Sequence, residues 1–231
     1  MSAFEDLSFS VEKFSGRARL FPLPNQVLFP HVMQPLHVFE PRYRDLLEDA
    51  LADDRLIAMA TLAPGWEKQY EGRPPLYPVA CLGRITTYHR LKDGTFNILV
   101  LGLRRVRLVR ELPAVNRFRE AEVEVYEDDY PPPNSSARGD LQQRLRKAFL
   151  QVLPLMPEAQ EQLDQLLDSG LALGVLTDLI SYMLDIGLPD KEALLAQTDV
   201  HCRAELLLTH LNAVADGAML RSDFPPKFSP N

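Results

Sequence analysis

Four prolines interrupt a single apolar stretch near the start of the sequence: Pro22, Pro24, Pro30 and Pro35. Because proline has no backbone N–H to donate, prolines spaced this closely cannot lie inside a central strand, and they suit strand ends, edge strands and bends. The apolar side chains between them still need burial, and we expect Phe29, Met33 and Phe39 in the core. The stretch therefore predicts a kinked, buried ribbon that leads into a helix with Pro41 in its first turn.

A series of strands is predicted beyond this ribbon and helix. They are expected over residues 56–62, 79–91, 95–101, 103–112 and 118–126. Asp93-Gly94 is a hairpin signal between two of them, and Gly102 is expected to break or bulge the ladder. About six strands with one inserted helix favour a small closed or partly closed β-barrel, because closure removes exposed strand edges.

The last part of the sequence is helical in its pattern. Apolar residues recur every three or four positions over residues 141–152, from Pro157 to Gly170, over 173–187 and over 200–217. A short turn is expected from Lys191 to Gln197, and Asp199 is expected to cap the last helix. The fold class is therefore α+β, a small barrel followed by an α-helical bundle.

Shifts in composition divide the chain into five parts. Residues 1–17 form a leader, 18–130 a β-rich subdomain, 131–139 a linker, 140–217 a helical subdomain and 218–231 a flexible tail. The N-terminus has a mixed, acidic composition without the pattern of a secretory signal. No apolar run approaches the roughly 18 residues that span a bilayer. We therefore expect a cytoplasmic protein without a membrane segment.

The proline-rich opening also carries a family resemblance. Phe21-Pro22-Leu23, the segment Val27–Pro30, the run Met33–Phe39 and a helix from Pro41 follow the order of a known family opening. Over about residues 18–216 the chain resembles the LON domain, the N-terminal substrate-binding domain of Lon proteases, in a stand-alone form. This resemblance implies a PUA-like β-barrel with a helical subdomain. It also implies a non-catalytic module that captures exposed or unfolded polypeptide, with client proteins and a protease or ATPase as partners.

Sequence signals for catalysis are missing. No G-x-x-x-x-G-K-[ST] or G-x-S-x-G occurs, and none of the 11 glycines is followed by lysine. No segment resembles a serine–lysine protease domain. No H-x-x-x-H or H-E-x-x-H spacing typical of zinc sites occurs among the five histidines, which are His31, His37, His89, His201 and His210. We therefore expect no catalytic residue, metal or cofactor, and a small enzyme with an unrecognised pocket is the weaker alternative.

Charge is unevenly distributed along the chain. The net charge of −7 argues against a general nucleic-acid binder, yet residues 84–119 hold nine basic and two acidic side chains. Strand alternation places Arg105 and Arg107 on one face and Arg104 and Arg110 on the other. Alternating glutamates on the next strand are expected to pair with some of them. An RNA-binding PUA-like module that uses these four arginines is the alternative function, although nucleic acid is not the expected partner.

Two aromatic residues, Trp66 and Tyr70, lie in the long polar loop of residues 63–78. A barrel core does not require aromatic residues there, and such side chains often form protein-binding hot spots. The competing interpretation is that they fold back over the barrel end. We expect Trp66 and Tyr70 to contact bound polypeptide. The client and the oligomeric state are left open by the sequence.

Overall fold

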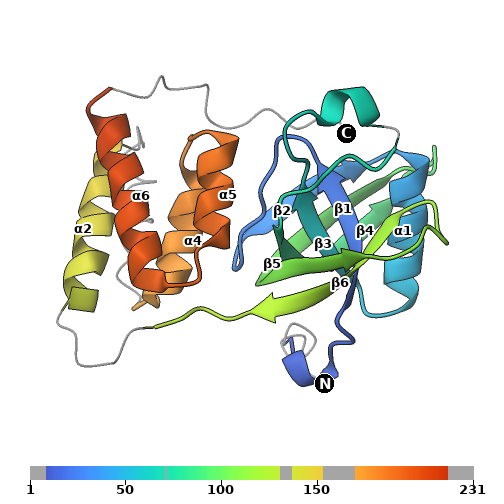
Figure 1. The fold of residues 1–231 in the computed structure, drawn as a ribbon, viewed down its shortest axis with the longest axis horizontal. Coiled ribbons are helices and arrows are strands. Elements are labelled where there is room, and N and C mark those ends of the chain that lie inside the picture. The colour runs from blue at the N-terminus through green and yellow to red at the C-terminus, as the bar shows by residue number, and fades with distance from the viewer. Residues whose placement is uncertain (1–8, 71, 131–136, 153–169, 218–231) are drawn as a thin grey trace. The chain divides into compact units, whose positions relative to one another are not determined.

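The computed structural model describes residues 9–70, 72–130, 137–152 and 170–217. The chain divides between Tyr126 and Glu127 into two compact units (Figure 1). Residues 127–130, expected to end the β-rich part, thus belong with the helices. The expected tail, most of the linker and the helix expected from Pro157 lie outside the described residues, as does half of the leader.

The first unit is built on six strands: β1 (Arg17–Leu23), β2 (Met33–Val38), β3 (Leu56–Thr61), β4 (Val79–Arg90), β5 (Phe96–Glu111) and β6 (Arg119–Tyr126). They form one sheet in the order β2-β5-β4-β3-β1-β6, and β5 also pairs with β6, which closes the sheet into a ring. The first half of β5 pairs with β2 and the second half with β6. Only β1 and β3 run parallel. The predicted α+β fold with a ring-like sheet is confirmed.

Gly102 lies where the proline-rich segment docks on β5. The strand is continuous there, but its register against β4 shifts, so Gly102 bulges the ladder and does not break it. Its N–H donates to Val32 O, and its carbonyl accepts from the His31 N–H, both at 2.8 Å. A Cβ on Gly102 would lie 2.0 Å from Phe29 O. Glycine is therefore required for the close approach of the two backbones.

The prediction that the whole proline-rich ribbon is buried is partly wrong. Phe29 is fully buried, but Met33 and Phe39 are 47% and 44% exposed. Strand β2 buries every second side chain, beginning with Gln34, so Met33 faces outward. Phe39 follows the last inward residue, Val38, and lies on the same outward side by alternation. Only one face of β2 thus contributes to the core.

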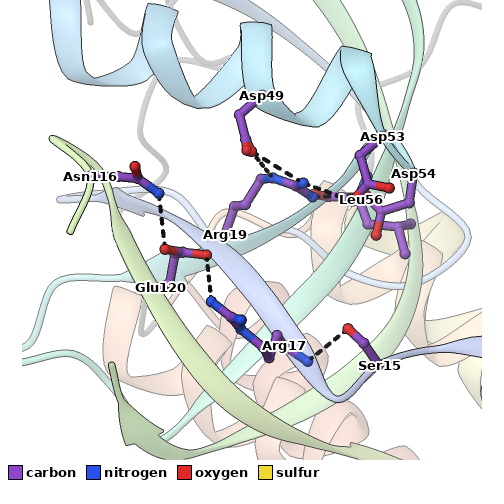
Figure 2. A network of polar contacts seen from close by, with 9 residues as sticks. All are labelled: Ser15, Arg17, Arg19, Asp49, Asp53, Asp54, Leu56, Asn116 and Glu120. Atoms are coloured by element: carbon purple, nitrogen blue, oxygen red, sulfur yellow. Dashed lines mark hydrogen bonds and ion pairs between the residues drawn. The ribbon is translucent and has the colours of Figure 1, made fainter. Parts of the chain in front are cut away.

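Helix α1 (Pro41–Ala52) is tied to the sheet by an arginine of β1 (Figure 2). Arg19 donates to Asp54 at 2.8 Å, to Asp53 at 2.9 Å and to Asp49 at 3.3 Å. The three carboxylates lie at the end of α1 and in the turn that leads to β3, while Arg19 itself is largely buried. The contacts therefore fix the C-terminal end of α1 against β1.

The second unit contains four described helices: α2 (Ala137–Val152), α4 (Leu173–Met183), α5 (Leu188–Ala196) and α6 (Val200–Ala215). Helix α6 contacts the other three. The turn predicted at Lys191–Gln197 is wrong, because α5 begins earlier with Pro189 in its first turn and includes most of that segment. The predicted cap is confirmed, since the Asp199 carboxylate accepts the Cys202 N–H at 2.9 Å. No described helix has both the length and the apolar character needed to cross a membrane.

Candidate functional site

Trp66 and Tyr70 form a contacting pair at the 3-10 helix η3 (Trp66–Gln69). Their rings meet edge to face with 5.5 Å between centroids, and both side chains are partly exposed. The Tyr70 hydroxyl donates to Glu40 Oε1 at 2.7 Å. Burial, together with this hydrogen bond, raises the pKa of Tyr70. The pair is thus not part of the core, but it is packed against the rest of the unit and does not project freely into solvent. This position has features of both interpretations of the sequence, a binding surface and a cap over the barrel end.

A pocket of about 250 Å³ lies in the β-rich unit, with Tyr70 in its wall. Its lining comes from the end of β1, the first turn of α1, the loop segments on both sides of η3, and the loop before β6 together with the first residue of β6. The polar and aromatic lining residues are Arg42, Tyr43, Tyr70, Arg73, Asn116, Arg117, Phe118 and Arg119. Four of these residues are arginines, and none of the described lining residues is Asp or Glu. The pocket therefore presents positive charge beside aromatic surface.

Arg42 is held between two tyrosine rings. Its guanidinium carbon lies 4.7 Å from the ring centroids of both Tyr43 and Tyr70. Nε donates to Glu40 Oε2 at 2.9 Å, and Nη1 donates to Tyr70 O at 3.2 Å. Glu40 thus binds both Arg42 and the Tyr70 hydroxyl. Stacking and charge-assisted hydrogen bonds fix the orientation of this guanidinium.

Arg119 is held in a similar way and is almost completely buried. Its Nε donates to Glu111 Oε2 at 3.0 Å, its Nη2 to the other oxygen of Glu111, and its Nη1 to Pro74 O at 2.9 Å. Arg73 reaches the same side of the pocket by donating to Leu112 O at 3.1 Å. A paired guanidinium this deeply buried has little freedom to move, so its position in the pocket wall is fixed.

The loop before β6 is anchored by a carboxylate of β6. Glu120 accepts from Asn116 Nδ2 at 3.1 Å and from Arg17 Nη2 at 3.3 Å (Figure 2). Asn116 is one of the lining residues. The contact therefore ties this wall of the pocket to β1.

Acid–base chemistry has no obvious agent in this pocket. The Tyr43 hydroxyl donates to Pro22 O at 2.8 Å, and burial raises its pKa strongly. It therefore remains protonated at neutral pH. No group of three or more His, Cys, Asp or Glu side chains able to hold a metal occurs in the described ranges. The arrangement is suited to binding a ligand.

The four arginines of the nucleic-acid alternative all lie on β5, but they do not form a free basic stripe. Arg107 donates to Glu124 at 2.5 Å, and Arg110 donates to Glu122 at 2.5 Å. Arg105 is buried, and Arg104 donates to a backbone carbonyl. The prediction that Arg110 shares a face with Arg104 is wrong. A bulge after Leu108 shifts the alternation by one residue, so Arg110 joins Arg107 on the outer face.

An outward apolar strip, which we call the β2 strip, consists of Met33, Pro35, Phe39, Leu99 and Leu101. Met33 is paired with Leu101 and Pro35 with Leu99 across β2 and β5, so these four side chains share one face of the sheet. Leu99 and Leu101 are partly exposed. The Phe39 ring stacks on His37, the next outward residue of β2, at 6.2 Å. His37, paired with Asn97, thus separates Phe39 from the other four members of the strip on the same face.

Sequence reasoning placed Tyr70 at a binding surface but did not identify the other pocket residues. Arg117 and Arg119 were part of the basic segment 84–119, whereas Arg42 and Arg73 are remote from it in the sequence. Their convergence depends on how α1 and two loops meet, for which the sequence carries no local signal. A Pro-x-Tyr start of a helix near an arginine-rich loop is too common to indicate a pocket.

Comparison with known proteins supplies the family. Residues 17–213 match the family described as the ATP-dependent protease La (LON) substrate-binding domain. Lon protease 2 of Myxococcus xanthus is 31% identical over 193 residues, which cover 84% of this chain and 23% of that protein. Lon protease of Anaeromyxobacter dehalogenans is 28% identical over 193 residues, 84% of this chain and 22% of that protein. The chain therefore spans about a quarter of the length of these curated relatives.

Solved structures agree with this match. A Lon N-terminal domain protein from Xanthomonas campestris has a TM-score of 0.60 at 25% identity, covering 84% of this chain and 97% of that one. The N-terminal domain of the Mycobacterium avium complex Lon protease has a TM-score of 0.65 at 19% identity, covering 85% and 98%, and shows the same fold. The chain belongs to the family of Lon substrate-binding domains.

Proposed function

We propose that this domain binds exposed or unfolded polypeptide through the β2 strip. The observation that carries the proposal is the outward position of Met33 beside Leu101, together with the exposure of Phe39 at the other end of the same face. Large apolar side chains that remain exposed together on a sheet face are typical of interaction surfaces. Trp66 and Tyr70, partly exposed and already in contact, are proposed as a second point of contact.

The edge of β2 supports the same proposal. Among the described strands β2 pairs with β5 alone, which leaves its other edge available to an added strand. An extended polypeptide can pair with such an edge through backbone groups and place alternate side chains on the neighbouring apolar face. This mode recognises an unfolded chain without requiring a particular sequence. It suits a domain whose clients share exposure of apolar residues.

Membership of the family supports a proposal for the partners. The curated relatives are named Lon proteases, and this chain matches about a quarter of their length. We propose that captured polypeptide is passed to an ATP-dependent protease. The ion pairs of Arg107 and Arg110 give those guanidinium groups carboxylate partners, so the RNA-binding alternative has no observation in its favour.

The test is a double substitution, Met33→Gln with Phe39→Gln. Each side chain is about half exposed, so covering the exposed halves of both contributes roughly 1.5–3 kcal/mol to binding. We expect the dissociation constant for a reduced, alkylated protein that cannot refold to rise about tenfold or more. Fluorescence anisotropy of the labelled unfolded protein measures this, and thermal denaturation should show little change.

Val109→Gln is the matched control. Val109 is 53% exposed but lies at the bulge of β5 that faces β6, outside the β2 strip. The control should bind like the original protein. Equal binding by the double variant and the original protein would exclude the β2 strip as the contact surface. A double variant that no longer folds would show that the two side chains are structural.

A further inference from the structure

The arginine-lined pocket differs from the β2 strip because its lining is charged and aromatic, whereas the strip is apolar. Its described lining combines Arg42, Arg73, Arg117 and Arg119 with Tyr43, Phe118 and apolar residues. Pockets for drug-sized ligands typically measure roughly 300–1,000 Å³. At about 250 Å³ this pocket is smaller. It therefore has room for a group about as large as one amino-acid residue.

Two guanidinium groups of the pocket keep N–H donors that no described residue accepts. Arg119 spends one N–H from each of its three nitrogens on Glu111 and Pro74 O. Arg42 donates from Nε to Glu40 and from Nη1 to Tyr70 O, and its Nη2 forms an ion pair with the same Glu40 oxygen at 2.8 Å. A guanidinium has five N–H groups, so each arginine retains one on Nη1 and one on Nη2 beyond the hydrogen bonds to described residues. Carboxylates hold both guanidinium groups in place. The orientation of their remaining N–H donors is therefore fixed before a ligand binds.

The balance of arginine and carboxylate charges around the pocket indicates the charge of the ligand that these donors bind. The four pocket arginines face three carboxylates within ion-pair distance in the described chain: Glu40, Glu111 and Asp45. One positive charge remains, which matches a monoanion better than a doubly charged phosphate. Guanidinium groups bind a carboxylate with two parallel hydrogen bonds, so a carboxylate suits both the charge and the geometry.

Aromatic and apolar lining restricts the ligand further. The Tyr43 hydroxyl is already bonded to Pro22 O, so its ring acts as a wall and not as a donor. Phe118 and Leu62 also line the pocket. The C-terminal residue of a polypeptide carries a carboxylate and a side chain on the same carbon, and therefore meets both kinds of lining at once. An internal aspartate or glutamate supplies the carboxylate alone.

We propose that this pocket binds the C-terminal residue of a polypeptide, with its α-carboxylate on Arg42 and Arg119 and its side chain against Tyr43 and Phe118. The proposal rests on the proposed function for the nature of the ligand, because it takes polypeptide as what the domain binds. It adds a recognition site for the chain end to the sequence-tolerant contact on the β2 strip. Capture of a terminal carboxylate by fixed donors is an established mode of peptide recognition.

The experiment compares two peptides of the same sequence that end in leucine, one with a free C-terminal carboxylate and one amidated. Isothermal titration calorimetry measures both. A charge-assisted hydrogen bond contributes far more than a neutral one, so we expect the amidated peptide to bind at least about tenfold more weakly. Arg42→Gln should abolish this difference, and Arg42→Lys should retain part of it. Arg110→Gln, an exposed arginine outside the pocket, should leave it intact.

Other outcomes overturn the proposal in distinguishable ways. Equal affinity for the free acid and the amide would exclude carboxylate recognition. An amidated peptide with an internal glutamate that binds as tightly as the free acid would assign the pocket to acidic side chains. Competition by inorganic phosphate at the peptide's own concentration would make it a general anion site. None of these results affects binding of unfolded protein to the β2 strip, which the Met33 and Phe39 variant tests by itself.

Discussion

Removal of one buried arginine should selectively destabilise the helical unit. Arg203 of α6 has no exposed surface. Its guanidinium donates to both oxygens of Asp128, at 2.9 and 2.7 Å, to Thr177 Oγ1 at 2.9 Å and to Gln197 O at 2.7 Å. Asp178, also fully buried, lies 3.7 Å from Arg203 Nε. One side chain thus joins the segment after β6 to α4, to α6 and to the turn between α5 and α6.

The substitution Arg203→Met keeps most of the side-chain volume and removes the charge and the donors. It leaves the carboxylates of Asp128 and Asp178 without their arginine in a buried site. Breaking a buried ion pair by removing one partner costs about 3–5 kcal/mol. Typical domains have a free energy of unfolding of roughly 5–15 kcal/mol, so the loss is a large part of the total.

Two optical probes separate the units. Far-UV circular dichroism at 222 nm is dominated by the helices, whereas Trp66, the single tryptophan, reports the β-rich unit. With a urea dependence of about 1–3 kcal/mol/M, a loss of about 3–5 kcal/mol should lower the dichroism midpoint by roughly 1–5 M. Arg144→Met is the control, because Arg144 of α2 forms a surface pair at 2.9 Å with Glu205 of α6, the helix that also carries Arg203. Such pairs contribute less than about 1 kcal/mol.

The reasoning would be refuted by either of two results. A midpoint for Arg203→Met equal to that of Arg144→Met would mean that the buried cluster contributes no more than a surface pair. A lower urea midpoint for Trp66 fluorescence with an unchanged dichroism midpoint would mean that Arg203 stabilises the β-rich unit and not the helical unit.

Two further substitutions test local features of the fold. Gly102→Ala should cost about 3 kcal/mol or more, because its Cβ would lie 2.0 Å from Phe29 O. Gly139→Ala, where nothing lies within 4 Å of the added Cβ, is the control and should not destabilise the protein in the same urea titration. Asp199→Ala should cost about 1 kcal/mol at neutral pH through loss of the helix cap. The Cys202 N–H lowers the pKa of Asp199 in the folded state, so this difference should shrink as the pH falls below about 4 and vanish below the lowered pKa. A cost that persisted at that acidity would exclude the charged cap as its source.

Local signals in the sequence were sufficient for most elements of the fold. The Asp93-Gly94 turn, the alternation in β6 and the Asp199 cap each depend on a few neighbouring residues, and each occurs as expected. Helix α5 has a weaker local signal, because its nine residues give only a short apolar spacing and its start is marked by Pro189 alone. The family resemblance implies the same order of elements as these local patterns.

Features that depend on tertiary structure were less predictable. Met33 and Phe39 look like core residues by composition, and only the pairing of β2 with β5 shows that they face outward. The bulge after Leu108 contains no glycine that would indicate it in the sequence. The prediction of the face on which Arg110 lies is therefore wrong. The pocket needs residues from several separate segments, and no local pattern brings them together.

Hydrogen–deuterium exchange with and without a reduced, alkylated protein tests the central claim most directly. If unfolded polypeptide adds to the edge of β2 and covers its apolar face, the amides of residues 33–38 should exchange more slowly in the complex. The amides of β6, whose outer face carries glutamates, should be unchanged. Slower exchange confined to β6 or to the helical unit, with none in β2, would contradict the account.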